Sequence, residues 1–145
     1  MDIKRLPNYA TISELYPVLK VPDVTYINLQ YNDFANNLTN IKKELGVTIH
    51  NFDDLDHFNN IDDVAALCAA LDMIVSTKTT VPFISAGVGT LTKVANWKQS
   101  PWNNILLNPI GPLVDIFERD TQESWDKVFS SIAEDIFKIT KNWSS

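Results

Sequence analysis

Apolar residues recur along this chain with two different spacings, and the change of spacing predicts where strands and helices lie. Residues 34–45 place apolar side chains at steps of four, three and four, which is the spacing of an amphipathic helix. Short runs rich in β-branched and other apolar side chains instead predict strands, and these fall at residues 24–30, 47–50, 73–75, 90–95, 105–107 and 114–117.

Polar residues predict where three of the helices begin or end. Thr11 and Glu14 have the separation of a capping box, which predicts a short helix that runs through Leu19. Gly46 is expected to end the helix at 34–45, and Asn60 is expected to cap a helix that follows it directly.

The last helix has the clearest apolar stripe of the chain. Asp120 and Glu123 have the spacing of a cap and its third-position acid, so we expect the helix to start beside them. A stripe of this width must pack on another part of the fold. Its members follow at steps of four, three, four and three: Trp125, Phe129, Ile132, Ile136 and Ile139.

The alternation of strands and helices from residue 24 onward predicts an α/β fold. Units of strand, helix and strand pair their strands in parallel and place helices on both faces of the sheet. We therefore expect a three-layer αβα sandwich with a mainly parallel sheet. The length of 145 residues and the hydrophobic content of 45% fit one domain over residues 1–145.

Charge and cysteine content exclude several classes of function. The chain has 12 basic and 18 acidic residues, and a net charge of −6 argues against a nucleic-acid partner. Its single cysteine, Cys68, excludes an intrachain disulfide, and the apolar helical run around it predicts a buried, inert thiol. There is neither a signal peptide nor an apolar run long enough to span a bilayer, so we expect a cytoplasmic protein.

The best candidate site follows the strand at 73–75, where the chain passes into the next helix. The first N–H groups of a helix lack internal partners and its dipole makes that end positive, which favours a phosphate there. The alternative is ordinary capping, with Thr79 as the N-cap and Pro82 in the first turn. Four hydroxyls and one ammonium make up the cluster: Ser76, Thr77, Lys78, Thr79 and Thr80.

A second polar segment follows the predicted strand at 24–30. Gln30, Tyr31 and Asn32 stand at its C-terminal end. Ligands of parallel sheets bind beyond the C-terminal ends of the strands, so we expect this segment to face the same cleft as residues 76–80.

Two other groups of residues have simpler structural explanations. The acidic segment that ends in His57 lacks the sixth-position glycine and twelfth-position glutamate of a calcium loop, so it predicts a solvated loop and no metal. Trp97 and Trp102 could stack on a base or sugar, but packing within a loop is the favoured explanation. The acids of the segment are Asp53, Asp54 and Asp56.

Several phrases, in the same order, resemble the C-terminal, donor-binding half of a GT-B glycosyltransferase. The type it is most similar to often follows tetratricopeptide repeats and is related to the heptosyltransferases. The helix–strand phrase at 61–76, IDDVAALCAALDMIVS, is the most specific match. The others are YINLQYND at 26–33, residues 77–94, SPW at 100–102, and residues 114–119 with Trp125, so the resemblance covers nearly the whole chain.

The resemblance implies a Rossmann-like domain that binds a nucleotide-sugar as substrate, with no metal or cofactor. The diphosphate would lie at the N-terminus of a helix over residues 80–86, with Lys78 as a point charge beside it and the Gln30 loop facing the same cleft. Lys78 stands where the family has an acid and Phe83 where it has a histidine, so no catalytic residue is assigned.

Two parts of the family's architecture have no counterpart in these 145 residues. One is the family's first strand, which is central in the strand order 3-2-1-4-5-6. The other is the N-terminal acceptor domain. We therefore expect a fragment of a longer protein, the donor-binding half of a glycosyltransferase-like enzyme that is inactive alone.

The alternative is a degenerate, non-catalytic Rossmann-like interaction module. The gap left by the first strand, together with the apolar face of the last helix, predicts a partner. That partner would be an acceptor domain, a repeat domain or a second copy of the chain.

Overall fold

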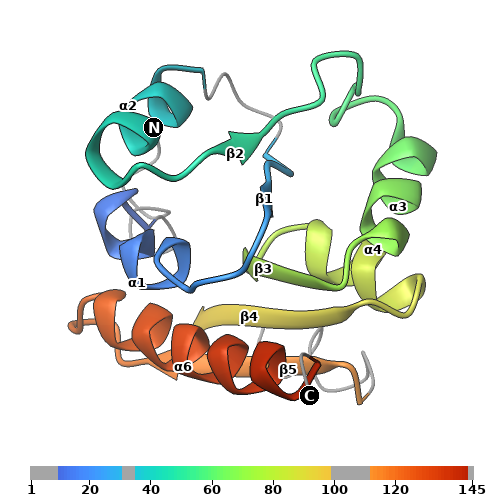
Figure 1. Cartoon of the computed structure of the whole chain (residues 1–145). Helices are drawn as coiled ribbons and strands as arrows, with labels where there is room; N and C mark the ends of the chain where they lie inside the picture. The colour runs from blue at the N-terminus through green and yellow to red at the C-terminus, as the bar shows by residue number, and fades with distance from the viewer. Residues whose placement is uncertain (1–9, 31–34, 99–111, 144–145) are drawn as a thin grey trace.

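A computed structural model describes residues 10–30, 35–98 and 112–143, and these form an α/β fold (Figure 1). Strands β1 (Tyr26–Ile27) and β2 (Ile49–His50) pair in parallel as one sheet. Strands β3 (Met73–Thr77), β4 (Leu91–Trp97) and β5 (Val114–Arg119) form a second parallel sheet in that order. The predicted α/β, Rossmann-like arrangement of parallel strands flanked by helices is confirmed.

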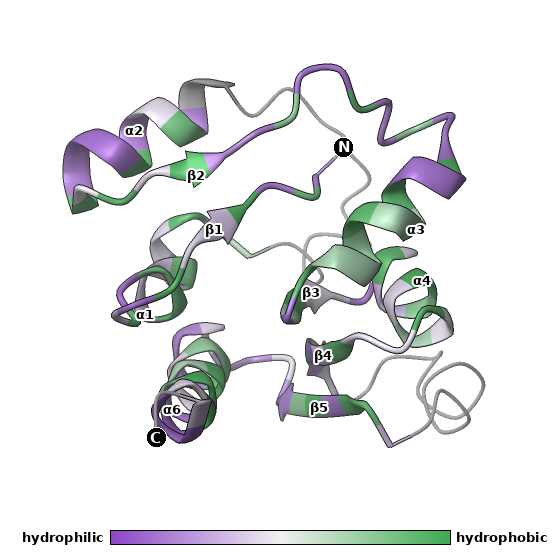
Figure 2. Cartoon of the chain, turned by 45° about the vertical axis from the view of Figure 1, so that its right-hand side comes forward, coloured by the Kyte–Doolittle hydropathy of each residue, from purple (hydrophilic) through white to green (hydrophobic). Residues whose placement is uncertain are grey.

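Helices cover the strands on two sides. Figure 2 shows α1 and α6 on one side of the molecule and α3 and α4 on the other. The short η2 (Ser13–Leu15) leads into α1 (Tyr16–Leu19), and α2 (Ala35–Leu45) connects β1 to β2. The remaining helices are α3 (Ile61–Ala70), α4 (Val81–Gly87) and α6 (Asp126–Trp143).

The predicted helix boundaries hold where the signal is local. The Thr11 N–H donates to Glu14 Oε2 at 2.8 Å, and the Glu14 N–H donates to Thr11 Oγ1 at 3.4 Å, which is the reciprocal pair of a capping box. Asn60 Oδ1 accepts from the Asp63 N–H at 3.2 Å and caps α3. Gly46, with φ of 69°, follows the end of α2 in the left-handed conformation that glycine permits.

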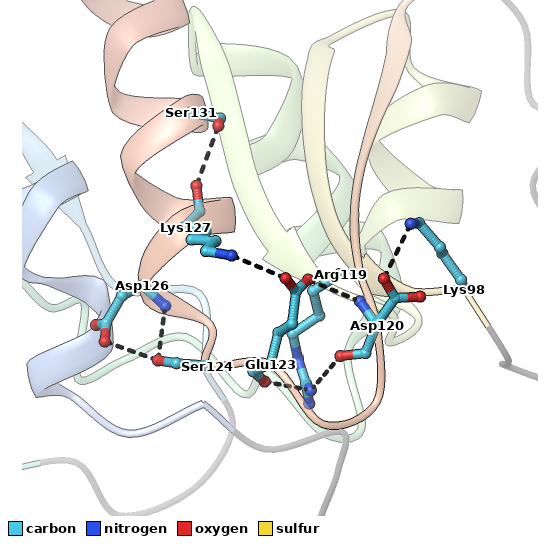
Figure 3. A network of polar contacts seen from close by, with 8 residues as sticks. All are labelled: Lys98, Arg119, Asp120, Glu123, Ser124, Asp126, Lys127 and Ser131. Atoms are coloured by element: carbon cyan, nitrogen blue, oxygen red, sulfur yellow. Dashed lines mark hydrogen bonds and ion pairs between the residues drawn. The ribbon is translucent and has the colours of Figure 1, made fainter.

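The predicted start of the last helix is wrong. The Glu123 N–H donates to the Asp120 carbonyl at 3.0 Å, so these two residues close a turn before the helix. The Arg119 guanidinium holds that turn, donating to the carbonyls of Asp120 and Glu123 at 3.0 and 2.7 Å (Figure 3). It also donates to the Thr121 carbonyl at 2.9 Å. The Asp120 carbonyl thus accepts from both the Glu123 N–H and Arg119, and α6 begins only at Asp126.

Two predicted strands are shorter than expected. Residues 24–30 yield only the two-residue β1, and residues 47–50 yield only β2. Among the described residues β1 pairs with β2 alone, so one of its edges lacks the ladder that would extend it. The strand expected at 105–107 lies outside the described residues.

The core consists of two apolar clusters on opposite faces of β3. On one face four of the five predicted stripe residues pack against Val18, Val21 and Ala95, with Met73 and Val75 beside them; the four are Trp125, Phe129, Ile132 and Ile136, and Ile139 lies outside this cluster. On the other face Val64 and Cys68 of α3 pack against Ile74. Cys68 is fully buried as predicted, and its burial raises the pKa of the thiol.

A buried lysine lies in the α6 face of β4. Lys93 is 2% exposed, and its Nζ lies 2.5 Å from Asp115 of β5 and also bonds Asp135 of α6. Burial opposes its charge, but the bonds to the two carboxylates outweigh burial and raise the pKa of Lys93. The three residues therefore tie β4, β5 and α6 together.

We expect the two carboxylates that pair with Lys93 to contribute more to stability than the lysine charge itself. Replacing both acids (Asp115→Asn with Asp135→Asn) should cost about 3 kcal/mol, because it leaves a buried charge uncompensated. Lys93→Met should change stability by less than about 1 kcal/mol, because it removes the charge and keeps an apolar stem. Urea unfolding of the three proteins measures both values, and a Lys93→Met loss as large as that of the double variant would contradict this account.

Glu14 links the N-terminal segment to α6. Its Oε1 accepts from the Trp125 N–H at 3.1 Å and from Ser124 Oγ at 3.2 Å. Partial burial opposes the charge, but the hydrogen bonds from Thr11, Trp125 and Ser124 prevail and lower the pKa of Glu14 below 4.5. The ionised form is thus the one that the folded protein stabilises.

A lowered carboxyl pKa makes this link sensitive to acid. Its stabilising effect is fully present above the unfolded-state pKa and disappears as the pH falls through the lower folded-state value. Glu14→Gln should therefore lower the melting temperature at pH 7 and converge with the parent protein as the pH drops below 4.5. Glu134→Gln, on the exposed side of α6, is the matched control and should leave the pH profile of melting unchanged.

Candidate functional site

A cavity of about 1800 Å³ lies between the two sheets and gathers most of the predicted site. Residues 26–30 of the β1 segment line one side, and β3 lines the other. The predicted residues that line it are Gln30, Ser76, Thr77, Lys78, Thr79 and Thr80. Tyr31 and Asn32 lie outside the described residues. The two polar segments therefore face one space, as the shared C-terminal edge of parallel strands predicts.

The hydroxyls of the cluster partly bond to local groups. Ser76 Oγ donates to the Thr77 carbonyl at 2.8 Å and lies 3.3 Å from Thr79 Oγ1. Ser76 and Thr77 are half-buried, whereas Thr79 and Thr80 are exposed. The exposed pair is thus the part of the cluster most open to a ligand.

The helix end that follows offers less to an anion than expected. The residue at the N-cap of α4 is Thr80, not Thr79, and its side chain makes no capping bond, so the predicted cap is wrong. The N–H groups of Phe83 and Ile84 both donate to the Thr80 carbonyl, at 3.0 and 3.2 Å, and Pro82 has no N–H. The helix has only seven residues, so side chains rather than a dipole must carry any anion binding here.

Lys78 supplies the positive charge of the cluster. Partial burial lowers its pKa, and the nearby carboxylate of Glu118 offsets part of that effect. Lys78 follows β3 directly and Glu118 lies near the end of β5, so the pair spans the C-terminal edge of the larger sheet. The ammonium can act as a point charge toward a phosphate.

Two pairs of polar side chains at the strand ends were not expected from the sequence. Asn28 is 8% exposed, and its Nδ2 donates to Asn51 Oδ1 at 2.8 Å. Its Oδ1 accepts from the Gln30 N–H at 3.1 Å and so positions Gln30. A single asparagine inside the apolar run at 24–30 was the available signal, because a buried amide must find partners.

The second pair joins β4 to β5. Asn96 is 1% exposed, and its Nδ2 donates to Glu118 Oε1 at 3.0 Å. The two residues stand opposite one another in the parallel register. This bond fixes the carboxylate that faces Lys78.

The acidic segment behaves as a self-bonded loop. Asp56 accepts from the Asn59 side chain at 2.8 Å and from the N–H groups of Asn59 and Phe58 at 2.9 and 3.0 Å, and these bonds lower its pKa. Across residues 10–30, 35–98 and 112–143, His, Cys, Asp and Glu form no group of three that could hold a metal ion. Trp97 lines the cavity, and Trp102 lies outside the described residues.

Comparison with known proteins gives one distant similarity. The chain is 32% identical over 142 residues to Protein FlbA of Caulobacter vibrioides. The match takes in 92% of this chain but only 22% of FlbA, so the chain spans about a fifth of the length of that relative. No family model matches the chain, and no solved structure matches it. Within the described ranges, none of the helices has the length and apolar character needed to cross a bilayer.

Proposed function

We propose that this chain is the nucleotide-sugar-binding half of a glycosyltransferase-like protein, without activity until an acceptor domain completes it. The supporting observation is that Gln30 and residues 76–80, from two strands that are not neighbours in sequence, line one cavity at the C-terminal edge of the sheets. The resemblance of residues 61–76 to the donor-binding half of such enzymes supplies the substrate class.

Binding of the diphosphate would rest on hydroxyls and one ammonium. Thr79 and Thr80 are exposed toward solvent, and Lys78 brings a positive charge to the same rim. Charge-assisted hydrogen bonds to a phosphate are the stronger kind, so Lys78 would contribute more than either hydroxyl.

We expect UDP-, GDP- or ADP-glucose to bind this edge of the cavity. Titration calorimetry with the three nucleotide-sugars measures the affinity, and Lys78→Gln should weaken the tightest of them roughly tenfold by removing a charged hydrogen-bond donor. Lys138→Gln, an equal charge change on the exposed side of α6, is the control and should leave the affinity unchanged.

The result also separates the two candidate functions. If none of the three sugars binds while circular dichroism shows an intact fold, the donor-binding proposal fails and a non-catalytic interaction module takes its place. That second function is favoured by Phe83, which lines the same cavity with an apolar ring where the resembling family has an imidazole.

A further inference from the structure

Strand β3 carries the sequence of an interior strand but the exposure of an edge strand. β4, which pairs with both β3 and β5, is buried from Thr92 through Asn96. β3 is as apolar over Met73–Ile74–Val75, yet only Ile74 is buried, and within the described ranges it pairs with β4 alone. An apolar strand with an unpaired edge is a site where another strand can add.

The β1 segment presents a second such edge to the same space. β1 pairs only with β2 in the part of the chain that the structure describes, and its residues line the cavity opposite β3. Figure 2 shows β1 and β2 above β3, β4 and β5, as two groups of strands. The cavity is therefore bounded by two strand edges, whose N–H and C=O groups need partners when covered.

The connections around the cavity make it the central position of a doubly wound sheet. The chain leads from β1 through α2 to β2, and then from β3 through α4 to β4 and on to β5. Each path leads away from the cavity, and all the pairings are parallel. A doubly wound sheet reverses its strand order at such a point with its strands paired without a break, whereas among the described residues β1 and β3 do not pair with each other.

The residues that line the cavity indicate the chemistry of the segment that would fit into it. The walls are mainly apolar, and several large apolar side chains around it remain exposed, among them Phe58 at 72% and Ile61 at 61%. A strand covered by helices on both faces is apolar on both faces. At about 1800 Å³ the cavity also exceeds the space of about 300–1,000 Å³ that a small ligand fills, so a nucleotide at its C-terminal end would leave the middle empty.

We propose that the space between β1 and β3 receives one extended, apolar β-strand from polypeptide outside these 145 residues, which runs parallel to β3 and joins the two sheets into one. The strand needs about five residues to match the five of β3. In FlbA most of the chain lies outside the matched region, so additional polypeptide accompanies this module there. This inference is independent of nucleotide-sugar binding, because it concerns backbone pairing in the middle of the cavity.

Two peptides test the proposal, one that can form backbone hydrogen bonds with neighbouring strands and one that cannot. The probe is a blocked peptide of alternating valine and isoleucine, about five residues long, with two lysines at each end for solubility. It should slow amide exchange roughly tenfold at residues 26–30 and 73–77 and raise the melting temperature. The same peptide with an N-methyl group on every interior amide is at least as apolar but cannot donate a hydrogen bond to either neighbouring strand, and it should produce neither effect.

Two variants locate the effect. Ile27→Asp places a charge in the wall of the cavity and should abolish protection by the peptide, whereas Ile116→Asp, on exposed β5 away from the cavity, should leave it unchanged. The peptide comparison uses the unaltered chain, so the test stands even if Ile27→Asp fails to fold.

Three results would overturn the proposal. One is equal protection by the N-methylated peptide, which would mean a non-specific apolar contact. Another is no protection by either peptide with the fold intact. The third is protection of β3 in the peptide-free chain that rises with protein concentration, which would assign the space to a second copy. Nucleotide-sugar titrations on the same samples report the donor site separately, so either proposal can fail alone.

Discussion

The packing of α6 against the N-terminal segment holds the two groups of strands together. Phe129 and Ile132 are at most 1% exposed, and burial of each contributes about 1.5–3 kcal/mol. They belong to one cluster with Val18 and Val21, which flank the end of α1. Because no described strand pairs β1 with β3, this helix contact replaces the ladder that joins neighbouring strands in a continuous sheet.

β1 itself is anchored to that contact by one side chain. The Tyr26 hydroxyl donates to the Val18 carbonyl at 2.6 Å and lies 3.1 Å from the Val21 carbonyl. Burial raises the pKa of Tyr26 to about 12, so the hydroxyl keeps its proton and remains a donor. Within the described residues β1 has backbone pairing on one edge only, so few hydrogen bonds extend it, and it has only two residues.

The parts of the fold that follow from sequence are those whose causes lie within a few residues. The Thr11–Glu14 box, the Asn60 cap and the stripe of α6 depend on local spacing, and the structure has them. The start of α6 could not be predicted in this way, because Arg119 takes the carbonyls of the preceding turn. That guanidinium also lies 4.0 Å from the centre of the Trp125 ring, a contact that sequence spacing does not reveal.

The same distinction between local causes and tertiary contacts applies to the candidate site. That Gln30 and residues 76–80 line one cavity could be predicted, since the ends of parallel strands share an edge and the chain places polar residues after two of them. Its chemistry could not, because the first-turn N–H groups of α4 bond to Thr80, and Glu118 reaches Lys78 from a strand that is 40 residues away in sequence. Short-range rules place a phosphate at the helix end, whereas the tertiary contacts leave only side chains to bind the proposed anion.

The proposed strand and the proposed nucleotide-sugar would occupy different parts of the same cavity and would be bound by different chemistry. Its middle is bounded by strand edges and apolar side chains, whereas its C-terminal end carries Gln30, Lys78 and the two exposed threonines. A strand in the middle would end beside Gln30 and Ser76, because parallel strands end at the same edge of a sheet. It would thereby form a wall of the proposed donor site without contributing a charge to it. A protein that kept Phe83 and Lys78 at this edge could retain the sheet-completing contact after losing transfer chemistry, since backbone pairing does not depend on either side chain.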